Sequence, residues 1–359
     1  MGPVRMLWNP NCAHSSQRTS WELGARTSVR TMWTAPLTWN RTLASKVFIL
    51  HLALIQSQLS GILSHDYLIH VGNSSLMNNE FRIPGQVALI TGGNVGIGRI
   101  TAIELAKKGF QVVIAGRSLE RTQPVLDHIK SLTVDEPAIF LPLDLASLAS
   151  VRECARLFIQ LNLPLHLLVN NAGIAGMRGL TKDGFEMTFG VNHLGHFLLT
   201  QLLLEKLKSS GPSRVVTVSS RAHKRAAGID WDTLCLPTST WTGIREYAVS
   251  KLANLLSSAE LAKRVQGTSV STYALHPGIV DTEIWRAFPD WARPLLRLRG
   301  FLTPEEGART TLHCAMHAPQ KESGLYYADC KPMQPSALGQ NPELAAALWE
   351  RSEVWISNR

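Results

Sequence analysis

Tyr247 and Lys251 are the two residues whose types and spacing could carry out proton transfer. Residues four apart lie on the same face of a helix, so we expect the Lys251 ammonium beside the Tyr247 hydroxyl. A neighbouring positive charge favours the phenolate and is expected to lower the tyrosine pKa below its free value of about 10. Such a tyrosine can exchange a proton with an alcohol or a carbonyl, which is oxidoreductase chemistry. The same spacing also fits an exposed helix face, so a cofactor site elsewhere is the deciding observation.

A glycine-rich segment upstream supplies a candidate cofactor site. Residues 86–90 predict a short buried strand, and residues 91–98 continue as Thr-Gly-Gly-Asn-Val-Gly-Ile-Gly. Helix formers over residues 100–108 predict a helix that begins near Gly98, and a second strand is expected over residues 111–115. Glycines in such a turn let backbone amides approach a pyrophosphate, toward which the helix N-terminus directs its dipole.

The alternation of predicted strands and helices defines the fold class. It predicts an α/β fold, a Rossmann-type doubly wound parallel sheet covered by helices on both faces. A chain of 359 residues with 45% hydrophobic composition has ample material for one such core. We predict an N-terminal extension over residues 1–80, the Rossmann domain over 81–335 and a C-terminal helical tail over 336–359. The tail is expected to pack on the domain or on a partner subunit.

These motifs resemble those of the short-chain dehydrogenase/reductase family. The turn over residues 91–98 matches the family pattern Thr-Gly-x-x-x-Gly-x-Gly, and further motifs follow in the family's order. The resemblance covers roughly residues 84–335. It is closest to the retinol dehydrogenase and dehydrogenase X-like branch, through residues 191–197 and 250–254.

The resemblance implies a catalytic set of four residues. Tyr247 would donate a proton to the carbonyl oxygen, or accept one when an alcohol is oxidised, and Ser220 would position that oxygen. Tyr247 and Ser220 would therefore both contact the substrate. Lys251 would stabilise the phenolate and bind the ribose hydroxyls, and Asn192 would hold a water that links Lys251 to solvent. Ser219, next to Ser220, is the alternative catalytic serine.

The resemblance also implies a dinucleotide site. Asp144 is expected at the adenine ring, residues 171–173 beside the nucleotide, and Pro277, Gly278 and Thr282 at the nicotinamide end. The full predicted set of cofactor-binding residues is Gly92, Asn94, Gly96, Ile97, Gly98, Arg117, Asp144, Leu145, Asn171, Gly173, Tyr247, Lys251, Pro277, Gly278 and Thr282.

Arg117 decides which dinucleotide we expect. An acidic residue after the second strand accepts the ribose hydroxyls of NAD, whereas a basic one suits the phosphate of NADP. Gly116 and Arg117 occupy this place, so NADP is the predicted cofactor and NAD is the alternative. Many NADP-using relatives also carry a basic residue in the glycine turn, where this chain has Val95, so Arg117 would act almost alone, with Arg121 as its helper.

Residues 281–302 indicate the substrate class. They combine apolar and aromatic side chains with four arginines, which fits a cover over a lipophilic substrate as well as an ordinary amphipathic helix. We therefore predict hydride transfer between NADP(H) and a lipophilic alcohol or carbonyl, such as a retinoid, steroid or polyprenoid. The alternative is a dinucleotide-binding sensor or interaction protein without turnover, favoured by the unusual N-terminal extension.

Other classes of partner are not predicted. The net charge is +9, but the basic residues form no long run and no nucleic-acid motif is present. His193 and His196 lack the further ligands of a zinc site, so no metal is expected. The five cysteines are scattered and odd in number, which favours reduced thiols. The family resemblance favours a homo-oligomer.

The N-terminal extension bears on location. Its first 45 residues contain Glu22 as their only acid, a composition similar to a mitochondrial transit peptide. Residues 47–65 lack Asp, Glu, Lys and Arg, but polar residues make this stretch a marginal spanning helix, since about 20 mostly apolar residues are needed. We expect membrane association at the endoplasmic reticulum, with mitochondrial or cytoplasmic location as alternatives. The extension could also be a non-native start that precedes Met77.

Overall fold

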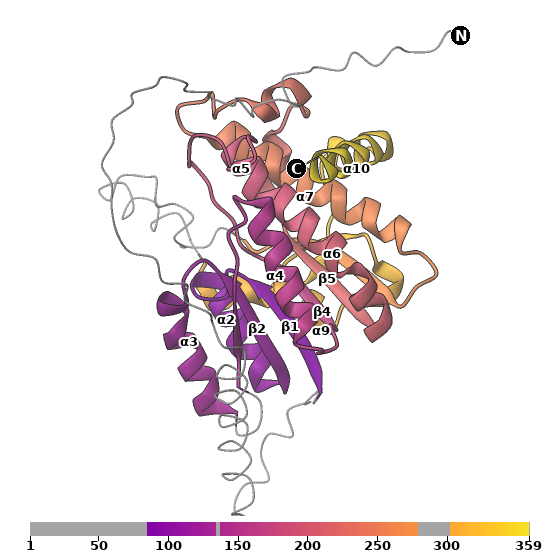
Figure 1. The fold of residues 1–359 in the computed structure, drawn as a ribbon. Helices are drawn as coiled ribbons and strands as arrows, with labels where there is room; N and C mark the ends of the chain where they lie inside the picture. Colours follow the sequence, from indigo (N-terminus) through magenta and orange to yellow (C-terminus); the bar gives the residue numbers. More distant parts are fainter. Residues whose placement is uncertain (1–84, 134–136, 279–301, 359) are drawn as a thin grey trace, which may run out of the picture. The chain divides into compact units, whose positions relative to one another are not determined.

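The computed structural model describes residues 85–133, 137–278 and 302–358 (Figure 1). The expectations for residues 1–80, for Thr282 and for residues 281–301 lie outside these ranges. Among the described helices, none combines the length and the apolar character needed to cross a membrane. That finding does not cover the candidate spanning segment over residues 47–65, which lies outside the described residues.

An eight-stranded sheet forms the centre of the fold, with the strand order β3-β2-β1-β4-β5-β6-β7-β8. All neighbours are parallel except the final pair, β7 and β8. The chain winds outward from β1 in both directions, so the carboxyl ends of β1 and β4 flank the point where the winding reverses, which is where such sheets bind ligands. The strands are Gln86–Thr91 (β1), Phe110–Gly116 (β2), Ile139–Pro142 (β3), Leu167–Asn170 (β4), Ser213–Val218 (β5), Val270–His276 (β6), Tyr326–Ala328 (β7) and Lys331–Pro332 (β8).

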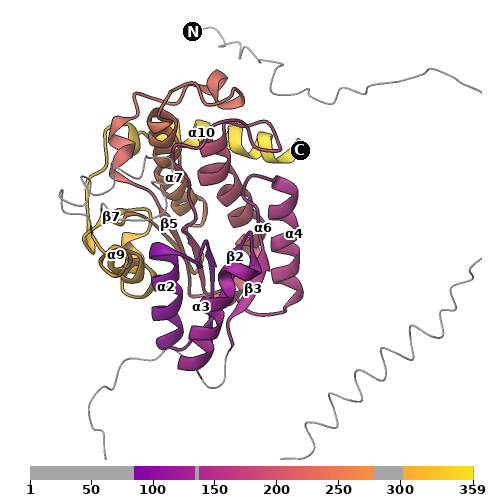
Figure 2. The same ribbon diagram turned by 90° about the vertical axis from the view of Figure 1, so that its left-hand side faces the viewer.

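Helices cover both faces of the sheet, and each face has its own apolar core (Figure 2). Side chains of β1 alternate between the two cores, because successive residues of a strand point to opposite faces: Val87 and Leu89 join one, and Ala88 and Ile90 the other. One face carries Gly96–Lys107 (α2), Leu119–Leu132 (α3) and Pro304–Met316 (α9); the other carries Leu148–Gln160 (α4), Gly195–Ser210 (α6), Ile244–Arg264 (α7) and Pro342–Ser357 (α10). The predicted doubly wound α/β fold is confirmed.

Most of the expected elements occur within a residue or two of their predicted ends. The strand expected over residues 86–90 spans Gln86–Thr91, and the strand expected over residues 111–115 spans Phe110–Gly116. Tyr247 and Lys251 share the helix α7, as their spacing predicts. Thr303 and Glu306 make the reciprocal capping box at the start of α9. Helix α2 begins at Gly96, two residues before the expected Gly98, with Val95 as a cap residue that contributes no side-chain hydrogen bond.

The sequence over residues 185–207 predicts one long helical stretch that contains Asn192. The structure interrupts this stretch, so the prediction of a continuous helix is wrong. A short helix, Met187–Phe189 (α5), passes into a π-helical turn, Gly190–Leu194 (η2), before α6 begins. Asn192 lies inside this turn. Asparagine disfavours a regular helix, and π-turns occur often at functional sites, so the interruption coincides with a residue predicted to be catalytic.

The C-terminal helix α10 packs on the domain itself. The Trp349 ring stands edge-on to Phe197 of α6, with ring centroids 4.8 Å apart, and the Arg264 guanidinium of α7 lies 4.7 Å from the centre of the indole. His193 of the π-turn hydrogen-bonds to Ser352 at 3.0 Å. Of the two expected docking places for the tail, the structure therefore shows the domain.

The cysteine expectation holds in part. Cys154 and Cys314 are buried free thiols, and Cys330 is a half-buried free thiol. Cys235 is disulfide-bonded, so the expectation of reduced thiols is wrong for that residue. Cys235 is the last residue of a short helix, Trp231–Cys235 (η4), and is half-buried, whereas Cys154 and Cys314 are buried.

Candidate active site

The glycine turn at the end of β1 depends on the absence of side chains. Gly92 and Gly96 have φ angles of 67° and 54°, a region that side chains disfavour. A Cβ atom on Gly98 would lie 2.3 Å from the Gly92 carbonyl oxygen and 2.4 Å from Nδ2 of Asn171. Only glycine lets α2 begin so close to this loop. The N-terminus of α2 lies directly after this glycine turn, and such an arrangement fits a pyrophosphate.

Thr91 ties the glycine turn to the end of β4. Its hydroxyl oxygen accepts hydrogen bonds from the backbone amides of Asn171 and Ala172, both at 3.0 Å. The Asn171 side chain donates in return to the Thr91 carbonyl at 2.9 Å. Residues from two separate predicted motifs therefore meet at the switch point of the sheet.

His196 links this junction to the π-turn, and sequence reasoning did not find it. Its Nδ1 lies 3.0 Å from the Asn192 carbonyl oxygen and its Nε2 lies 2.8 Å from the Thr91 hydroxyl. Since a carbonyl can only accept, Nδ1 must donate and Nε2 must accept from Thr91. Burial lowers the His196 pKa to about 4, so the ring is neutral. The Thr91 contact spans 105 positions of the chain, and no local motif indicates it.

Asn192 holds the loop after β4 against helix α7. Its Oδ1 accepts from the Ile174 amide at 2.8 Å, and its Nδ2 donates to the Ile174 carbonyl at 2.9 Å and to the Ser250 hydroxyl at 3.0 Å. Both amide hydrogens of this buried side chain are therefore used by protein groups. The water-holding role implied by the family resemblance stays a prediction.

Tyr247, Ser220 and Lys251 come together at the carboxyl end of β5. The Ser220 hydroxyl hydrogen-bonds with Tyr247. Lys251 is buried, its Nζ donates to the Val218 carbonyl at 2.9 Å, and it lies 5.7 Å from the centre of the Tyr247 ring. A Cβ on Gly173 would lie 3.5 Å from that Nζ, so this glycine brings the loop after β4 up to the lysine.

Ser219 and Ser220 have different surroundings. The Ser219 hydroxyl donates to the Lys251 carbonyl at 2.7 Å, and its amide donates to the Leu275 carbonyl at 2.7 Å. Ser219 therefore fastens α7 and β6 to the end of β5. Ser220, by contrast, reaches Tyr247, and its Oγ also accepts from the Ala222 amide at 3.1 Å. The geometry favours Ser220 as the serine that would meet a substrate.

The electrostatics of the pair differ from the expectation. Burial raises the pKa of Tyr247 to about 12, and the hydrogen bond from Ser220 opposes this rise only in part. Burial also lowers the pKa of Lys251 to about 7. The expected lowering of the tyrosine pKa by Lys251 is therefore not found, because loss of solvation penalises the phenolate and the ammonium alike. In this state Tyr247 keeps its proton, which suits donation to a carbonyl.

The other predicted cofactor residues follow the strand ends in the expected order. Arg117 is exposed and comes directly after Gly116, the last residue of β2, with no carboxylate in its place. Asp144 is half-buried; it accepts from the Ala146 amide at 3.1 Å and pairs with Lys182 at 3.2 Å.

Leu145, Pro277 and Gly278 complete the described part of this set. Leu145 is buried, and a Cβ on Gly195 would lie 2.7 Å from its carbonyl oxygen, so α6 passes directly over it. Pro277 and Gly278 follow β6, and Gly278 has a φ of 90°. These residues fit a phosphorylated dinucleotide, because a glycine turn precedes α2 and the exposed cation Arg117 follows β2.

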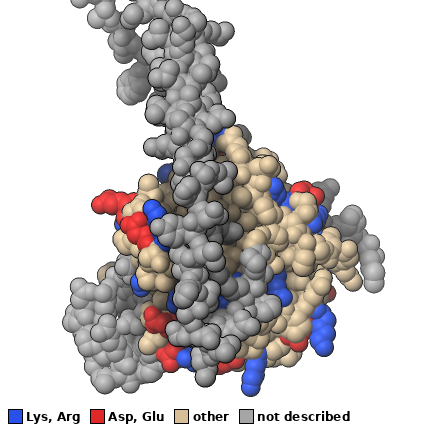
Figure 3. Space-filling view, turned by 90° about the horizontal axis from the view of Figure 1, so that it is seen from below, with Lys and Arg blue, Asp and Glu red and all other residues tan. Residues whose placement is uncertain are grey.

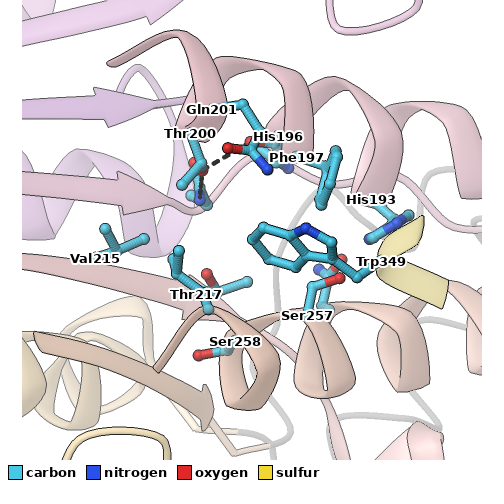
Figure 4. A pocket seen from close by; sticks show the side chains of 13 residues that line it. His193, His196, Phe197, Thr200, Gln201, Val215, Thr217, Ser257, Ser258 and Trp349 are labelled. Carbon is cyan, nitrogen blue, oxygen red and sulfur yellow. Dashed lines mark hydrogen bonds between the residues drawn. The ribbon is translucent and has the colours of Figure 1, made fainter. Parts of the chain in front are cut away.

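Two cavities lie apart from Tyr247 and Ser220. One of about 30 Å³ lies among α6, α7 and α10, where His193, His196 and Trp349 line it (Figure 4). The other, of about 320 Å³, lies among α5, η4 and the first turns of α7, with Glu186 and Val249 in its wall. Within the described ranges no group of three or more His, Cys, Asp and Glu side chains could hold a metal ion.

Comparison with known proteins identifies the family. The sequence profile described as short chain dehydrogenase matches residues 86–231. Dehydrogenase/reductase SDR family member 13 from Bos taurus is 44% identical over 75% of this chain and 72% of its own length. Retinol dehydrogenase 11 from Homo sapiens is 42% identical over 78% of this chain and 88% of its own length.

A solved structure agrees with the sequence matches. The Pseudomonas aeruginosa RhlG/NADP active-site complex superposes with a TM-score of 0.58 at 25% identity and covers 73% of this chain and 100% of that one. The glycine turn, the Ser220, Tyr247 and Lys251 cluster and these likenesses lead to one conclusion. This chain belongs to the short-chain dehydrogenase/reductase family and is an NAD(P)-dependent oxidoreductase of that family.

Proposed function

We propose that this enzyme transfers hydride between NADP(H) and a lipophilic alcohol or carbonyl compound, with Tyr247 as the proton donor and acceptor. The hydrogen bond between Ser220 and Tyr247 beside the buried Lys251 is the observation that carries this proposal. A bound nicotinamide would supply or accept the hydride. Negative charge then develops on the substrate oxygen, and two hydroxyl groups that already contact each other offer the hydrogen bonds that this charge needs.

The protonation state of the pair supports the carbonyl-reducing direction. A tyrosine whose pKa is raised to about 12 holds its proton at neutral pH and can give it to the forming alkoxide. Lys251, with its pKa lowered to about 7, can carry a proton or release it near neutral pH. In the oxidising direction the same hydroxyl must first lose its proton, which burial disfavours.

Four further parts of the proposal have their own support. Arg117 after β2 favours NADP, as does the NADP complex of the structural relative. The retinol dehydrogenases among the relatives support a retinoid-like or other lipophilic substrate. The apolar stretch over residues 47–65 supports membrane association, with the endoplasmic reticulum as the proposed location. A homo-oligomer is proposed from the family resemblance alone.

The test is a spectroscopic assay of nicotinamide oxidation with a panel of aldehydes and ketones of increasing chain length. We expect turnover with NADPH and a KM that falls as the substrate becomes more apolar. Tyr247→Phe should lose about 10²- to 10⁴-fold in kcat, the usual contribution of a positioned acid. Equal activity of the wild type and Tyr247→Phe would reject the assigned proton donor. Dinucleotide binding without turnover across the panel would favour a sensor protein.

A further inference from the structure

His223 is a buried histidine that lies three residues after Ser220 and that the proposed reaction does not use. It belongs to a 3-10 helix, Arg221–Arg225 (η3), which begins directly after Ser220, two residues beyond the end of β5. Ser220 is the cap residue of η3, and its backbone is extended, with a φ of −162° and a ψ of 156°. The chain turns at Ser220, so the groups that hold this turn also determine where the serine hydroxyl points.

The two nitrogen atoms of the His223 ring bind two separate backbone groups. Nδ1 lies 2.6 Å from the Ser220 carbonyl oxygen, and Nε2 accepts from the Ser336 amide at 3.2 Å. Since a carbonyl can only accept, Nδ1 must carry the proton, and since an amide N–H can only donate, Nε2 must be unprotonated. Both partners therefore require the same neutral tautomer. Burial lowers the pKa of His223 and so favours this neutral form.

The His223 ring holds the peptide group that follows Ser220. The Ser220 carbonyl accepts from two donors, the His223 ring and the His223 amide, the latter at 3.1 Å. The next amide in the turn, that of Ala222, donates to the Ser220 hydroxyl oxygen at 3.1 Å. A rotation of the peptide group would move the Ala222 amide away from this oxygen. The ring is therefore placed to keep the hydroxyl in the position from which it hydrogen-bonds with Tyr247.

The second partner of the ring belongs to a segment that packs on α7. Ser336 lies between β8 and α10, and its hydroxyl accepts from the Gly339 amide at 3.2 Å. A Cβ on Gly339 would lie 3.0 Å from the Leu255 side chain, so this segment rests directly on α7. Leu255 follows Lys251 by four residues and shares its helix face. His223 therefore connects the end of β5 to a segment packed on the helix that carries the lysine.

The burial of His223 contrasts with the exposure of its charged neighbours in η3. The Tyr326 ring of β7 stands edge-on to the histidine, with ring centroids 5.1 Å apart. Arg221, Lys224 and Arg225, by contrast, are exposed. The face shown in Figure 3 also carries exposed Lys and Arg, mixed with Asp and Glu, so exposed cations do not distinguish η3 from other surface segments. Its distinguishing feature is a buried ring with a defined partner at each nitrogen.

We propose that His223 is a positioning residue, whose ring holds the Ser220 carbonyl and thereby keeps the Ser220 hydroxyl aligned with Tyr247. This inference rests on the proposed function, because it assumes that Ser220 contacts the substrate oxygen during hydride transfer. The His223 ring bonds to backbone groups, so it acts through Ser220 and exchanges no proton with the substrate. Displacement of a reacting group by about 1 Å can cost about 10²-fold in rate, which makes such positioning measurable.

The experiment uses the full chain with NADPH and nonanal. The test variants are His223→Ala, His223→Asn and His223→Gln, each made in the wild type and in a Ser220→Ala background. The asparagine amide nitrogen can occupy the place of Nδ1, whereas glutamine extends toward the place of Nε2 and Ser336. The matched control is His166→Ala, because the His166 ring also binds a backbone group, the Val87 amide at 3.0 Å, but at the opposite end of the sheet.

We expect His223→Ala to lower kcat by about 10- to 100-fold and to change the KM for NADPH by less than about threefold. His223→Asn should restore kcat to within about threefold of the wild type, because it keeps a donor to the Ser220 carbonyl, and His223→Gln should resemble His223→Ala. In the Ser220→Ala background, His223→Ala should lower kcat by less than about twofold, since the hydroxyl that it positions is already absent. His166→Ala should keep the wild-type kcat.

The protonation of the His223 ring supplies a measurement that does not depend on activity. The nitrogen NMR spectrum of the wild type, assigned by comparison with His223→Asn, should show Nδ1 protonated and Nε2 unprotonated. A ring protonated at Nε2 could not accept from Ser336 and would contradict the contacts on which the positioning role depends. This measurement and the kcat of His223→Asn decide the matter even if His223→Ala does not fold.

Two kinetic results would overturn the positioning role. One is an equal loss of kcat from His223→Ala in both backgrounds, which would indicate a general loosening of the fold. The other is recovery of kcat by His223→Gln and not by His223→Asn, which would make the Ser336 contact the important one. A wild-type kcat in Ser220→Ala alone would instead contradict the proposed function, because the serine would then be dispensable whatever His223 holds.

Discussion

The glycine turn after β1 and the cluster on α7 position their chemical groups in different ways. At the turn, Gly98 admits no side chain and backbone amides of the β4 end bind Thr91, so geometry is held by close packing and neutral hydrogen bonds. On α7, the removal of water from Tyr247 and Lys251 changes their protonation. Added side-chain volume should therefore disturb the glycine turn, whereas a change in solvation should disturb the α7 cluster. Substitutions can test these two effects separately.

Substitutions of Ser220 and Ser219 should have the most different effects on catalysis and stability at the catalytic cluster. We expect Ser220→Ala to lower kcat by about 10²- to 10³-fold, as removal of one hydrogen-bond donor to a developing oxyanion does, with little change in stability. Ser219→Ala should leave kcat within a few-fold and lower the free energy of unfolding by about 1 kcal/mol, through loss of its bond to the Lys251 carbonyl. Steady-state kinetics and urea unfolding of both variants measure this. The reverse pattern would make Ser219 the catalytic serine.

Gly98→Ala tests the packing of the turn. The added methyl would meet the Gly92 carbonyl at 2.3 Å, so the backbone must shift at a cost of about 1–3 kcal/mol. We expect the dissociation constant for NADPH, measured by fluorescence titration, to rise by about 10- to 100-fold. Gly116→Ala serves as the control for stability, because its nearest neighbour would be 4.0 Å away. Unchanged NADPH binding by Gly98→Ala would show that the turn is not the pyrophosphate site.

Lys251→Met tests the solvation of the α7 cluster. In the unfolded chain Lys251 binds a proton up to its ordinary pKa of 10.5, whereas in the folded protein it loses the proton near 7. The unfolded state therefore holds more protons between these values, and stability should rise with pH from about 7 to 10, by at most about 1.4 kcal/mol per pH unit. Above pH 10 the raised pKa of Tyr247 should reverse the slope, since the unfolded tyrosine ionises first.

Urea unfolding at a series of pH values measures this contribution. The difference between the wild type and Lys251→Met isolates it from other groups, because the variant keeps a side chain of similar length without the amine. A wild-type slope that the variant retains would show that Lys251 is not the group whose pKa is lowered.

His196→Ala should produce the smallest effect on cofactor binding, because His196 only connects the two regions. Its loss removes the ring donor to the Asn192 carbonyl and the ring acceptor for the Thr91 hydroxyl. We expect a decrease of about 1–3 kcal/mol in stability and a rise of less than about tenfold in the KM for NADPH. His193→Ala is the matched control, since this neighbouring buried histidine hydrogen-bonds to Ser352 and not to Thr91 before the glycine turn. A changed KM in both variants would point to general loosening of the fold.

Local patterns predicted much of the fold. The first two strands and the helix after the glycine turn depend on neighbours in sequence, and they were found close to their expected places. The interruption around Asn192 was not expected, because helix propensity describes single residues. The π-turn is fixed by the contacts of Asn192 with Ile174 and Ser250, which lie 18 and 58 positions away.

The sequence predicted the residues of the candidate site better than it predicted their protonation. The sequence placed Tyr247 and Lys251 four apart on a helix, and the structure brings Ser220 to the tyrosine. The direction of the Tyr247 pKa could not be read from that spacing. A nearby cation lowers a phenol pKa and burial raises it, so the outcome depends on how much water the surrounding chain excludes.

By itself, the sequence determined which segments form strands and helices, where backbone must approach a phosphate, and which residue types are available for hydride chemistry. Those properties follow from side-chain periodicity, glycine content and short-range spacing. Only the tertiary structure decided that Ser219 fastens α7 while Ser220 reaches Tyr247, that His196 joins the turn to Asn192, and that Tyr247 stays protonated. Each of these depends on burial and on contacts between residues far apart in the chain, which local spacing does not specify.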